Sequence, residues 1–339
     1  MSAGDRHVPT GVDPEMWAWL SRRSSRGTSW TLQRIVEAKG ARRISVVLPA
    51  RDEERTVGGI VAQIRRRLIE DVGLVDELIV IDSRSRDATA AVAAAAGATV
   101  YHQDQILPDQ PRMDGKGDAL WKGLAVSTGD IVLFVDSDLR DFTPQFIVGL
   151  LGPLLCDAGV VFVKAHYLRP LTTDKVTVPG GGGRVSELVA RPLINMFWPQ
   201  LAGFVQPLAG EYGGYRHVLE QIPFATGYGV ELAMLIDLLD HVGLDGLAQV
   251  DLGTRTHHHQ DIEALGRMAA QILQTAYTRL QGERPASRWL TQFRHDTASP
   301  VHHQLTISDI AVHQRPPLAH LRDALTPAGS IRPLANQQP

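Results

Sequence analysis

The 339-residue sequence predicts an α/β protein with a mostly parallel sheet flanked by helices. Short runs of branched, aliphatic and aromatic residues recur at 44–50, 77–83 and 130–138, which is typical of strands buried on both faces. The segments between these runs include stretches with apolar residues at helical spacing, so strands and helices alternate. This alternation predicts right-handed crossovers, with ligands bound at the carboxyl ends of the strands.

The other expected elements follow from local patterns. The first 40 residues carry Trp17, Trp19 and Trp30 among polar residues, which favours a helical or irregular segment packed on the rest of the chain. The glycine run at 180–183 is expected to be a loop that leads into a helix starting near Ser186. The remaining expected elements are crossover helices at 56–73 and 87–98, strands at 99–103, 160–167 and 248–255, and helices after Lys116 and Glu231.

Composition restricts the class of partner. The chain has 34 lysines and arginines against 37 acidic residues, and its net charge of −3 gives no reason to expect nucleic acid or an anionic membrane. Its one cysteine, Cys156, excludes an internal disulfide and is compatible with a reducing cytoplasm. We see neither a secretion signal at the start nor an apolar run long enough to span a bilayer, so a cytoplasmic protein is expected.

Two aspartates end the strand at 130–138. Residues two apart in a strand point the same way, so Asp136 and Asp138 present two carboxylates on one side, where they require water or a cation. The alternative is a solvated loop whose aspartates cap a turn. The three histidines at 257–259 offer a second source of ligands, although they too can belong to a solvated loop. Carboxylate and imidazole ligands favour Mg²⁺ or Mn²⁺, since one cysteine rules out a cysteine-rich zinc site.

Three further features have both a functional and a structural interpretation. The glycine run with Arg184 and Ser186 could bind a phosphorylated or carboxylated substrate, or it could be a linker with an ordinary serine cap. Lys116, between two glycines, could contact a diphosphate or lie in a surface turn. Glu231, at the start of an apolar helix, could serve the chemistry or simply favour the helix dipole.

The order of these motifs is specific. PARDEE, IDSRSRD and VDSDL, each at a strand end, resemble the metal-dependent glycosyltransferases of the GT-A type, in which an Asp-x-Asp signature binds a nucleotide sugar through a divalent ion. PGGGGRVSELVARPL, QPLAGEYGGYR, FATGYGVE and VDLGTRTHHH closely resemble the glucosyl-3-phosphoglycerate synthases, with the mannosyl-3-phosphoglycerate synthases as near relatives. The likeness extends from about residue 44 to about residue 280.

We expect four parts: an N-terminal arm (1–40), a Rossmann-like part that binds the nucleotide sugar (41–165), a part that binds the acceptor and completes the metal site (166–282), and a C-terminal extension (283–339). The resemblance covers the arm and the extension poorly. It also implies a homodimer, for which the arm with Trp17 and Trp19 is a candidate interface.

The resemblance assigns site residues position by position. The metal would be held by Asp138 and His257, and the catalytic residues would be Glu231, Asp138 and Lys116. The nucleotide sugar would be bound by Pro49, Ala50, Arg51, Asp52, Glu53, Ser83, Lys116, Asp136, Ser137, Tyr228, Gly229, Val230 and Glu231. The acceptor would be bound by Gly183, Arg184, Val185, Ser186 and His259. The family often has threonine in place of Ser186 and asparagine in place of His259, so the contact of His259 with the acceptor is in question.

The implied activity is transfer of glucose from UDP-glucose to 3-phosphoglycerate, with retention of configuration and with Mg²⁺ or Mn²⁺. The alternatives are a mannosyl-3-phosphoglycerate synthase that uses GDP-mannose and a polyprenyl-phosphate sugar transferase. A sugar-1-phosphate nucleotidyltransferase is disfavoured because PARDEER lacks its glycine-rich loop. A non-catalytic nucleotide-sugar sensor would not need Asp138, Glu231 and His257 together.

Overall fold

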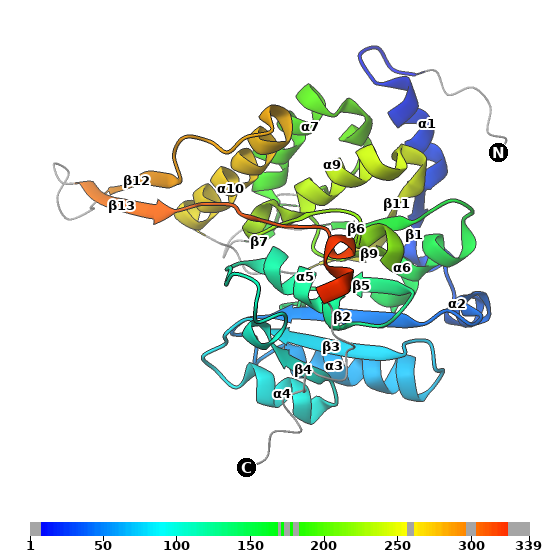
Figure 1. Ribbon diagram of the computed structural model, residues 1–339. Helices are drawn as coiled ribbons and strands as arrows, with labels where there is room; N and C mark the ends of the chain where they lie inside the picture. Colours follow the sequence, from blue (N-terminus) through cyan, green and yellow to red (C-terminus); the bar gives the residue numbers. More distant parts are fainter. Residues whose placement is uncertain are drawn as a thin grey trace.

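A computed structural model describes residues 8–168, 171–172, 177–178, 183–255, 261–295 and 303–324 (Figure 1). Its central sheet has eight strands in the order β1-β11-β6-β9-β5-β2-β3-β4. All neighbours in this sheet pair in parallel except β9, which is antiparallel to both β5 and β6. The predicted α/β class and mostly parallel sheet are therefore confirmed.

Six of the eight strands of this sheet lie close to the predicted positions. Their bounds are β1 Ser24–Arg26, β2 Ile44–Ala50, β3 Glu77–Asp82, β4 Thr99–His102, β5 Ile131–Phe134, β6 Phe162–Leu168, β9 Tyr212–Tyr215 and β11 Leu247–Thr254. Strands β1 and β9 were not predicted. Three two-stranded sheets add β7 Leu171–Thr172 with β8 Thr177–Val178, β10 Phe224–Ala225 with β14 Gln314–Arg315, and β12 Trp289–His295 with β13 His303–Asp309.

Helices cover both faces of the sheet, because successive strand residues point to opposite sides. In β2, Val46 joins one hydrophobic cluster with α3 and α6, and Val47 joins a second cluster with α5 and α9. The helices are α1 Pro14–Arg23, α2 Leu32–Lys39, α3 Val57–Ile64, α4 Thr89–Ala96, α5 Lys116–Val126, α6 Gln145–Cys156, α7 Arg191–Phe197, α8 Arg216–Leu219, α9 Val230–Val242 and α10 Ile262–Gln281. Helix α3 continues as a π-helical stretch over Arg65–Glu70, and another such stretch, Ser186–Ala190, precedes α7.

Strand β9 enters the sheet because two glycines allow it. A side chain at Gly213 would lie 2.4 Å from the side chain of Leu133, and one at Gly214 would lie 2.6 Å from the carbonyl oxygen of Val161. Both distances are shorter than van der Waals contact, so neither position accommodates a side chain without a local shift. The strand joins β5 to β6 and thereby brings the two halves of the sheet together.

The N-terminal segment is part of the sheet. Strand β1 pairs with β11, and the indole nitrogen of Trp19 donates to the carbonyl oxygen of Leu247 at 2.8 Å. The Trp19 ring lies 4.6 Å from that of Phe204 and is fully buried. Trp19 therefore stabilises the chain internally, which contradicts its suggested place at an interface between copies.

The C-terminal segment is also in contact with the rest of the structure. Strand β14 pairs with β10, while the β12–β13 hairpin projects from the molecule beside α10 (Figure 1). Among the helices in the described part of the chain, none has the length and apolarity needed to cross a membrane.

Candidate active site

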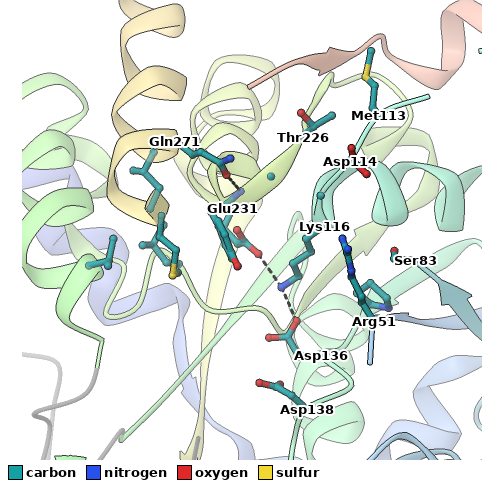
Figure 2. Close-up of a pocket in the computed structure, with 18 of the residues that line it drawn as sticks. Arg51, Ser83, Met113, Asp114, Lys116, Asp136, Asp138, Thr226, Glu231 and Gln271 are labelled. Atoms are coloured by element: carbon teal, nitrogen blue, oxygen red, sulfur yellow. Dashed lines mark hydrogen bonds and ion pairs between the residues drawn. The ribbon is translucent and has the colours of Figure 1, made fainter. Parts of the chain in front are cut away.

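A pocket of about 820 Å³ lies at the carboxyl ends of β2, β3 and β5 (Figure 2). The strand ends, the start of α5, the turn before α9 and part of α10 all contribute to its wall. The predicted site residues that line it are Pro49, Ala50, Arg51, Glu53, Ser83, Lys116, Asp136, Ser137, Asp138, Gly183, Arg184, Val185, Ser186, Tyr228 and Glu231. Positions from both halves of the chain thus meet in one cavity.

Lys116 lies between two carboxylates at the floor of this pocket (Figure 2). Its amine is 2.5 Å from Oδ1 of Asp136 and 2.9 Å from Oε1 of Glu231. Burial by itself would lower the pKa of Lys116, but the two carboxylates raise that pKa well above its usual value. The lysine is therefore a fixed positive charge at the start of α5.

Arg255, at the end of β11, is a second fixed cation. Its Nη2 lies 2.8 Å from Oδ1 of Asp138 and 3.3 Å from Oδ2 of Asp136, while its Nη1 lies 3.0 Å from Oε1 of the buried Glu211. Burial would raise the pKa of Asp136, but Lys116 and Arg255 lower it below its usual value. Asp136 thus remains an anion held between two cations.

The buried carboxylate of Glu211 holds the guanidinium of Arg255 in place. Burial raises the pKa of Glu211 although Arg255 opposes the shift, and the hydroxyl of Tyr167 donates to Oε2 of Glu211 at 2.7 Å. Nη1 of Arg255 donates to the same hydroxyl at 2.6 Å. These contacts hold the guanidinium in place independently of Asp138.

Asp138 differs from Asp136 in its exposure to the pocket. The side chain of Asp138 is 46% exposed and that of Asp136 is 20% exposed. A carboxylate open to the pocket fits a hard divalent cation, which prefers oxygen ligands. The described residues contain no set of three or more His, Cys, Asp or Glu arranged around one point, so other ligands are needed to complete such a site. His257 and His259 lie outside the described residues.

The loop after β2 lines the pocket with all but one of its predicted residues. Asp52 instead connects this loop to the loop after β3: its N–H donates to Oγ of Ser85 at 3.0 Å, and its Oδ1 accepts from the N–H of Arg86 at 2.7 Å. Asp52 has a φ of 58°, in the left-handed region, and is not among the residues that line the pocket. Asp52 therefore links the two loops by hydrogen bonds. Burial, followed by the charge of Asp138, raises the pKa of Glu53.

Gly229 and Val230 also lie away from the wall. A side chain at Gly229 would come within 1.9 Å of Oγ1 of Thr275, so this glycine allows α10 to approach closely. Val230 is fully buried in the core. The neighbouring Tyr228 does line the pocket, and its N–H donates to Oε1 of Gln271 on α10 at 2.9 Å.

The predicted acceptor residues form another part of the wall. Gly183 has a φ of 77°, a value that favours glycine, and its carbonyl oxygen accepts from the N–H of Glu187 at 3.1 Å. Arg184, Val185 and Ser186 follow it along the same wall. A helix begins close to Ser186 as predicted, and its stretch Ser186–Ala190 is π-helical. The first three residues of the glycine run, 180–182, lie outside the described residues.

Several functional candidates were missed by sequence reasoning. Arg255 follows a strand and stands beside the histidines, which was an available signal; Glu211 is an acid inside an otherwise uncharged, tightly packed segment. Gln271 on α10 and Arg288, Asp309, Ala311 and His313 of the C-terminal segment also line the pocket, and no pattern in the sequence indicated them.

Comparison with known proteins identifies the class. The model of the family described as glycosyl transferase family 2 matches residues 45–169, which carry the strand ends around the nucleotide side of the pocket. Together with the mostly parallel sheet and the carboxylates at its edge, this match defines a glycosyltransferase with a GT-A-like fold.

Full-length relatives define the family. The glucosyl-3-phosphoglycerate synthase of Mycolicibacterium smegmatis is 46% identical over 306 residues, which are 90% of this chain and 98% of the relative. A crystal structure of the Mycobacterium tuberculosis enzyme of that name, in complex with Mn²⁺, UDP-glucose and phosphoglyceric acid, has a TM-score of 0.77 at 43% identity, covering 86% of this chain and 96% of that one. The mannosyl-3-phosphoglycerate synthase of Rubrobacter xylanophilus has a TM-score of 0.82 at 38% identity, covering 91% and 99%. The chain belongs to the glucosyl-3-phosphoglycerate synthase family.

Proposed function

We propose that the protein transfers glucose from UDP-glucose to 3-phosphoglycerate and requires Mg²⁺ or Mn²⁺. The observation that carries this proposal is the convergence, in one pocket, of Lys116, Asp138 and Glu231 with the glycine-loop residues Arg184 and Ser186. The M. tuberculosis relative is described in complexes with Mn²⁺, UDP-glucose and phosphoglyceric acid, and with Mg²⁺ and UDP.

The residues at the floor of the pocket must stabilise the charge that develops on the leaving group. Breaking the bond between sugar and phosphate places negative charge on the departing diphosphate and positive charge on the sugar ring. Asp138 and, in our assignment, His257 would hold a divalent cation, which would supply Lewis-acid stabilisation of the diphosphate. Lys116 adds a positive charge that is already in place, because Asp136 and Glu231 fix its amine before the ligand arrives.

The sugar side is assigned to Glu231. Its carboxylate is nearly buried and its Oε1 is held by Lys116, so it keeps a fixed direction toward the pocket. A fixed carboxylate can orient the hexose and stabilise positive charge that develops on the ring. Same-face attack by the acceptor hydroxyl, with retention of configuration, is the stereochemical course that we propose.

The acceptor is assigned to the wall formed by Gly183 to Ser186. Arg184 provides a guanidinium for phosphate or carboxylate, and Ser186 provides a hydroxyl. An acceptor that carries both anionic groups, such as 3-phosphoglycerate, matches this wall.

A product assay tests the proposal. Purified protein would be incubated with Mg²⁺ or Mn²⁺, 3-phosphoglycerate and a panel of nucleotide sugars that includes UDP-glucose and GDP-mannose. Glucosylated phosphoglycerate from UDP-glucose is the expected product. Mannosylated product from GDP-mannose alone would replace glucose by mannose in the assignment, and absence of any glycosylated phosphoglycerate would overturn it.

We also propose that the enzyme acts in the cytoplasm.

We further propose that the enzyme forms a homodimer. The support for pairing is one face of the β12–β13 hairpin, where Trp289, Phe293, Leu305 and Ile307 are 56%, 65%, 53% and 59% exposed. The strand register places these four side chains on one face of the hairpin. An exposed apolar face on both copies suits a two-fold interface. Sedimentation equilibrium of wild type and Phe293→Asp should give a dimer and a monomer, and a monomeric wild type would contradict the pairing.

A further inference from the structure

Arg315, in the C-terminal segment, is fully buried. Its Nε donates to Oδ1 of Asp118 at 2.6 Å, and both side chains have no exposed area. Its Nη2 donates to the carbonyl oxygen of Pro111 at 2.6 Å, and its guanidinium carbon lies 4.9 Å from the centre of the Trp121 ring. A fully buried ion pair has a large desolvation cost, so its surroundings must be closely arranged for it to form.

Asp118 connects Arg315 to the pocket through further hydrogen bonds. Its second oxygen, Oδ2, accepts a short hydrogen bond from Nε2 of Gln103. The other end of that amide, Oε1, accepts from the hydroxyl of Ser83 at 2.5 Å. Gln103 and Ser83 both line the pocket, whereas Arg315 and Asp118 do not. We call Arg315, Asp118, Gln103 and Ser83 the hydrogen-bond relay.

The chemistry of the groups fixes the direction of every hydrogen bond in the relay. A carboxylate paired with a guanidinium accepts and does not donate, so the NH₂ group of Gln103 must face Asp118. The carbonyl end of Gln103 must then face Ser83, and the hydroxyl proton of Ser83 is committed to it. Toward the pocket, the oxygen of Ser83 is left with lone pairs only.

We propose that Arg315 is a positioning residue for the donor nucleotide: through the hydrogen-bond relay it fixes Ser83 as a hydrogen-bond acceptor in the pocket. The group of the nucleotide that meets Ser83 is then an N–H or O–H donor, such as the imide N–H of uracil or a ribose hydroxyl. This inference rests on the proposed function, because it takes the ligand of this pocket to be a uridine nucleotide.

Arg315 lies beyond the residues that the glycosyl transferase family 2 model matches. The family model ends at residue 169, and Arg315 lies 197 positions beyond Asp118. Strand β14 holds it in place by pairing Arg315 with Phe224, and the peptide N–H of Thr226 donates to the carbonyl oxygen of His313 at 2.8 Å. A segment near the end of the chain thereby controls a hydroxyl at the end of β3.

The test is UDP affinity in variants that interrupt the relay at two places. Arg315→Lys keeps the charge but loses the planar fork that reaches both Asp118 and Pro111, and Gln103→Met breaks the relay while leaving the buried ion pair intact. Calorimetric titration should show UDP binding weakened about tenfold in each variant, as for loss of one hydrogen bond to an enforced acceptor. KM for 3-phosphoglycerate should stay within about twofold of wild type.

A double-mutant cycle separates positioning from general destabilisation. In a Ser83→Ala background, Arg315→Lys should weaken UDP binding no further, because the relay then ends on no hydroxyl. Arg279→Lys is the matched control: Arg279 pairs with Asp237 at 2.6 Å, largely buried, between α10 and α9 and outside the pocket wall. It should lower the unfolding temperature without changing UDP affinity.

The outcomes distinguish this inference from the function on which it rests. Wild type that binds no UDP overturns both. Wild type that binds UDP, with Arg315→Lys and Gln103→Met binding it equally well, overturns the relay alone, as does a full loss from Arg315→Lys in the Ser83→Ala background. Titration with CDP identifies the donor group: a loss confined to UDP assigns the imide N–H, which cytosine lacks, and an equal loss for both assigns a ribose hydroxyl.

Discussion

Asp136 and Asp138 share the guanidinium of Arg255, yet only Asp136 is also held by a lysine. Nη2 of Arg255 lies 3.3 Å from Asp136 and 2.8 Å from Asp138, while the amine of Lys116 lies 2.5 Å from Asp136. The two aspartates of the Asp-x-Asp signature therefore have different duties. Asp136 neutralises buried cations, and Asp138 remains open to the pocket.

Neutralising each aspartate in turn should separate these duties. Asp138→Asn should keep a free energy of unfolding close to that of wild type, because Arg255 retains Glu211, but it should lose the gain in UDP affinity that Mn²⁺ provides. Asp136→Asn should destabilise the fold by about 3 kcal/mol, since it leaves buried cations uncompensated. Urea unfolding and calorimetric titration with and without Mn²⁺ measure both effects. Unchanged Mn²⁺-dependent binding in Asp138→Asn would remove Asp138 from the metal site.

Removing the amine of Lys116 should affect the chemical step. In Lys116→Met the diphosphate loses a positive charge that is in place before the bond breaks, and we expect kcat to fall about 10²-fold to 10³-fold. KM for 3-phosphoglycerate should change much less, because the lysine faces Asp136 and Glu231 rather than the acceptor wall. Steady-state kinetics with both substrates varied gives the two constants. A kcat within about threefold of wild type contradicts the assigned role.

Lys164 on β6 should give the protein a pH-dependent stability. Burial lowers the pKa of its amine to about 7, and the carboxylate of Glu231 only partly opposes that shift. Between this pKa and the ordinary value of 10.5, the unfolded chain holds a proton that the folded chain has lost, so stability rises with pH by up to about 1.4 kcal/mol per pH unit. Below pH of about 7 the amine is charged in both states and this gain is absent.

The Lys164→Met variant tests this assignment. Urea unfolding at several pH values between about 7 and 10 should give a flatter dependence of unfolding free energy than wild type. Lys39→Met, at a partly exposed lysine that pairs with Asp76, should leave the wild-type dependence in place over the same range. Parallel curves for Lys164→Met and wild type would show that the buried amine stays charged.

Substitution by alanine at two helical glycines, Gly117 in α5 and Gly59 in α3, should change the stability of the fold in opposite directions. At Gly117, beside Lys116, a side chain would meet the carbonyl oxygen of Ala225 at 1.8 Å, so Gly117→Ala should destabilise by about 1–3 kcal/mol through a backbone shift. At the exposed Gly59 in α3 nothing lies within 4 Å of the added carbon, so Gly59→Ala should stabilise by about 0.5–1 kcal/mol. Thermal unfolding compares them directly. A Gly117→Ala protein as stable as wild type would mean that this helix start has room to move.

The parts of the fold that could be predicted are those whose signal is local. Strand β2 matches its predicted range of 44–50 because a run of buried apolar residues ends at the polar ARDEE. Strand β9 was missed because its sequence is YGGY, which has no hydrophobic pattern typical of a strand. Its glycines are required by the close approach of neighbouring strands, which the sequence does not reveal. Strand β1, with the sequence SSR, was missed because it is short and polar and is defined by its partner β11.

The same distinction holds for the site. Residues at strand ends, such as Ser83 and Asp138, could be placed because parallel strands deliver their carboxyl ends to one edge. Arg255 and Glu211 act through contacts with distant residues, and no periodicity encodes such a contact. Asp52 belongs to PARDEE and was assigned with its neighbours, but its hydrogen bonds are made with Ser85 and Arg86 in the loop after β3, and it does not line the pocket.

The insertion of β9 also sets the order in which the enzyme can be completed during synthesis. Strand β5 has left the ribosome long before residues 212–215, so its free edge waits for most of the intervening chain before β9 covers it. Strand β1, which precedes β5 in the chain, waits still longer for residues 249–251. Both joints close through contacts distant in sequence, the kind that form slowly and leave strand edges exposed to misassociation in the meantime. The free edge of β5 and strand β1 therefore stay unpaired until residues 212–215 and 249–251, respectively, have been made.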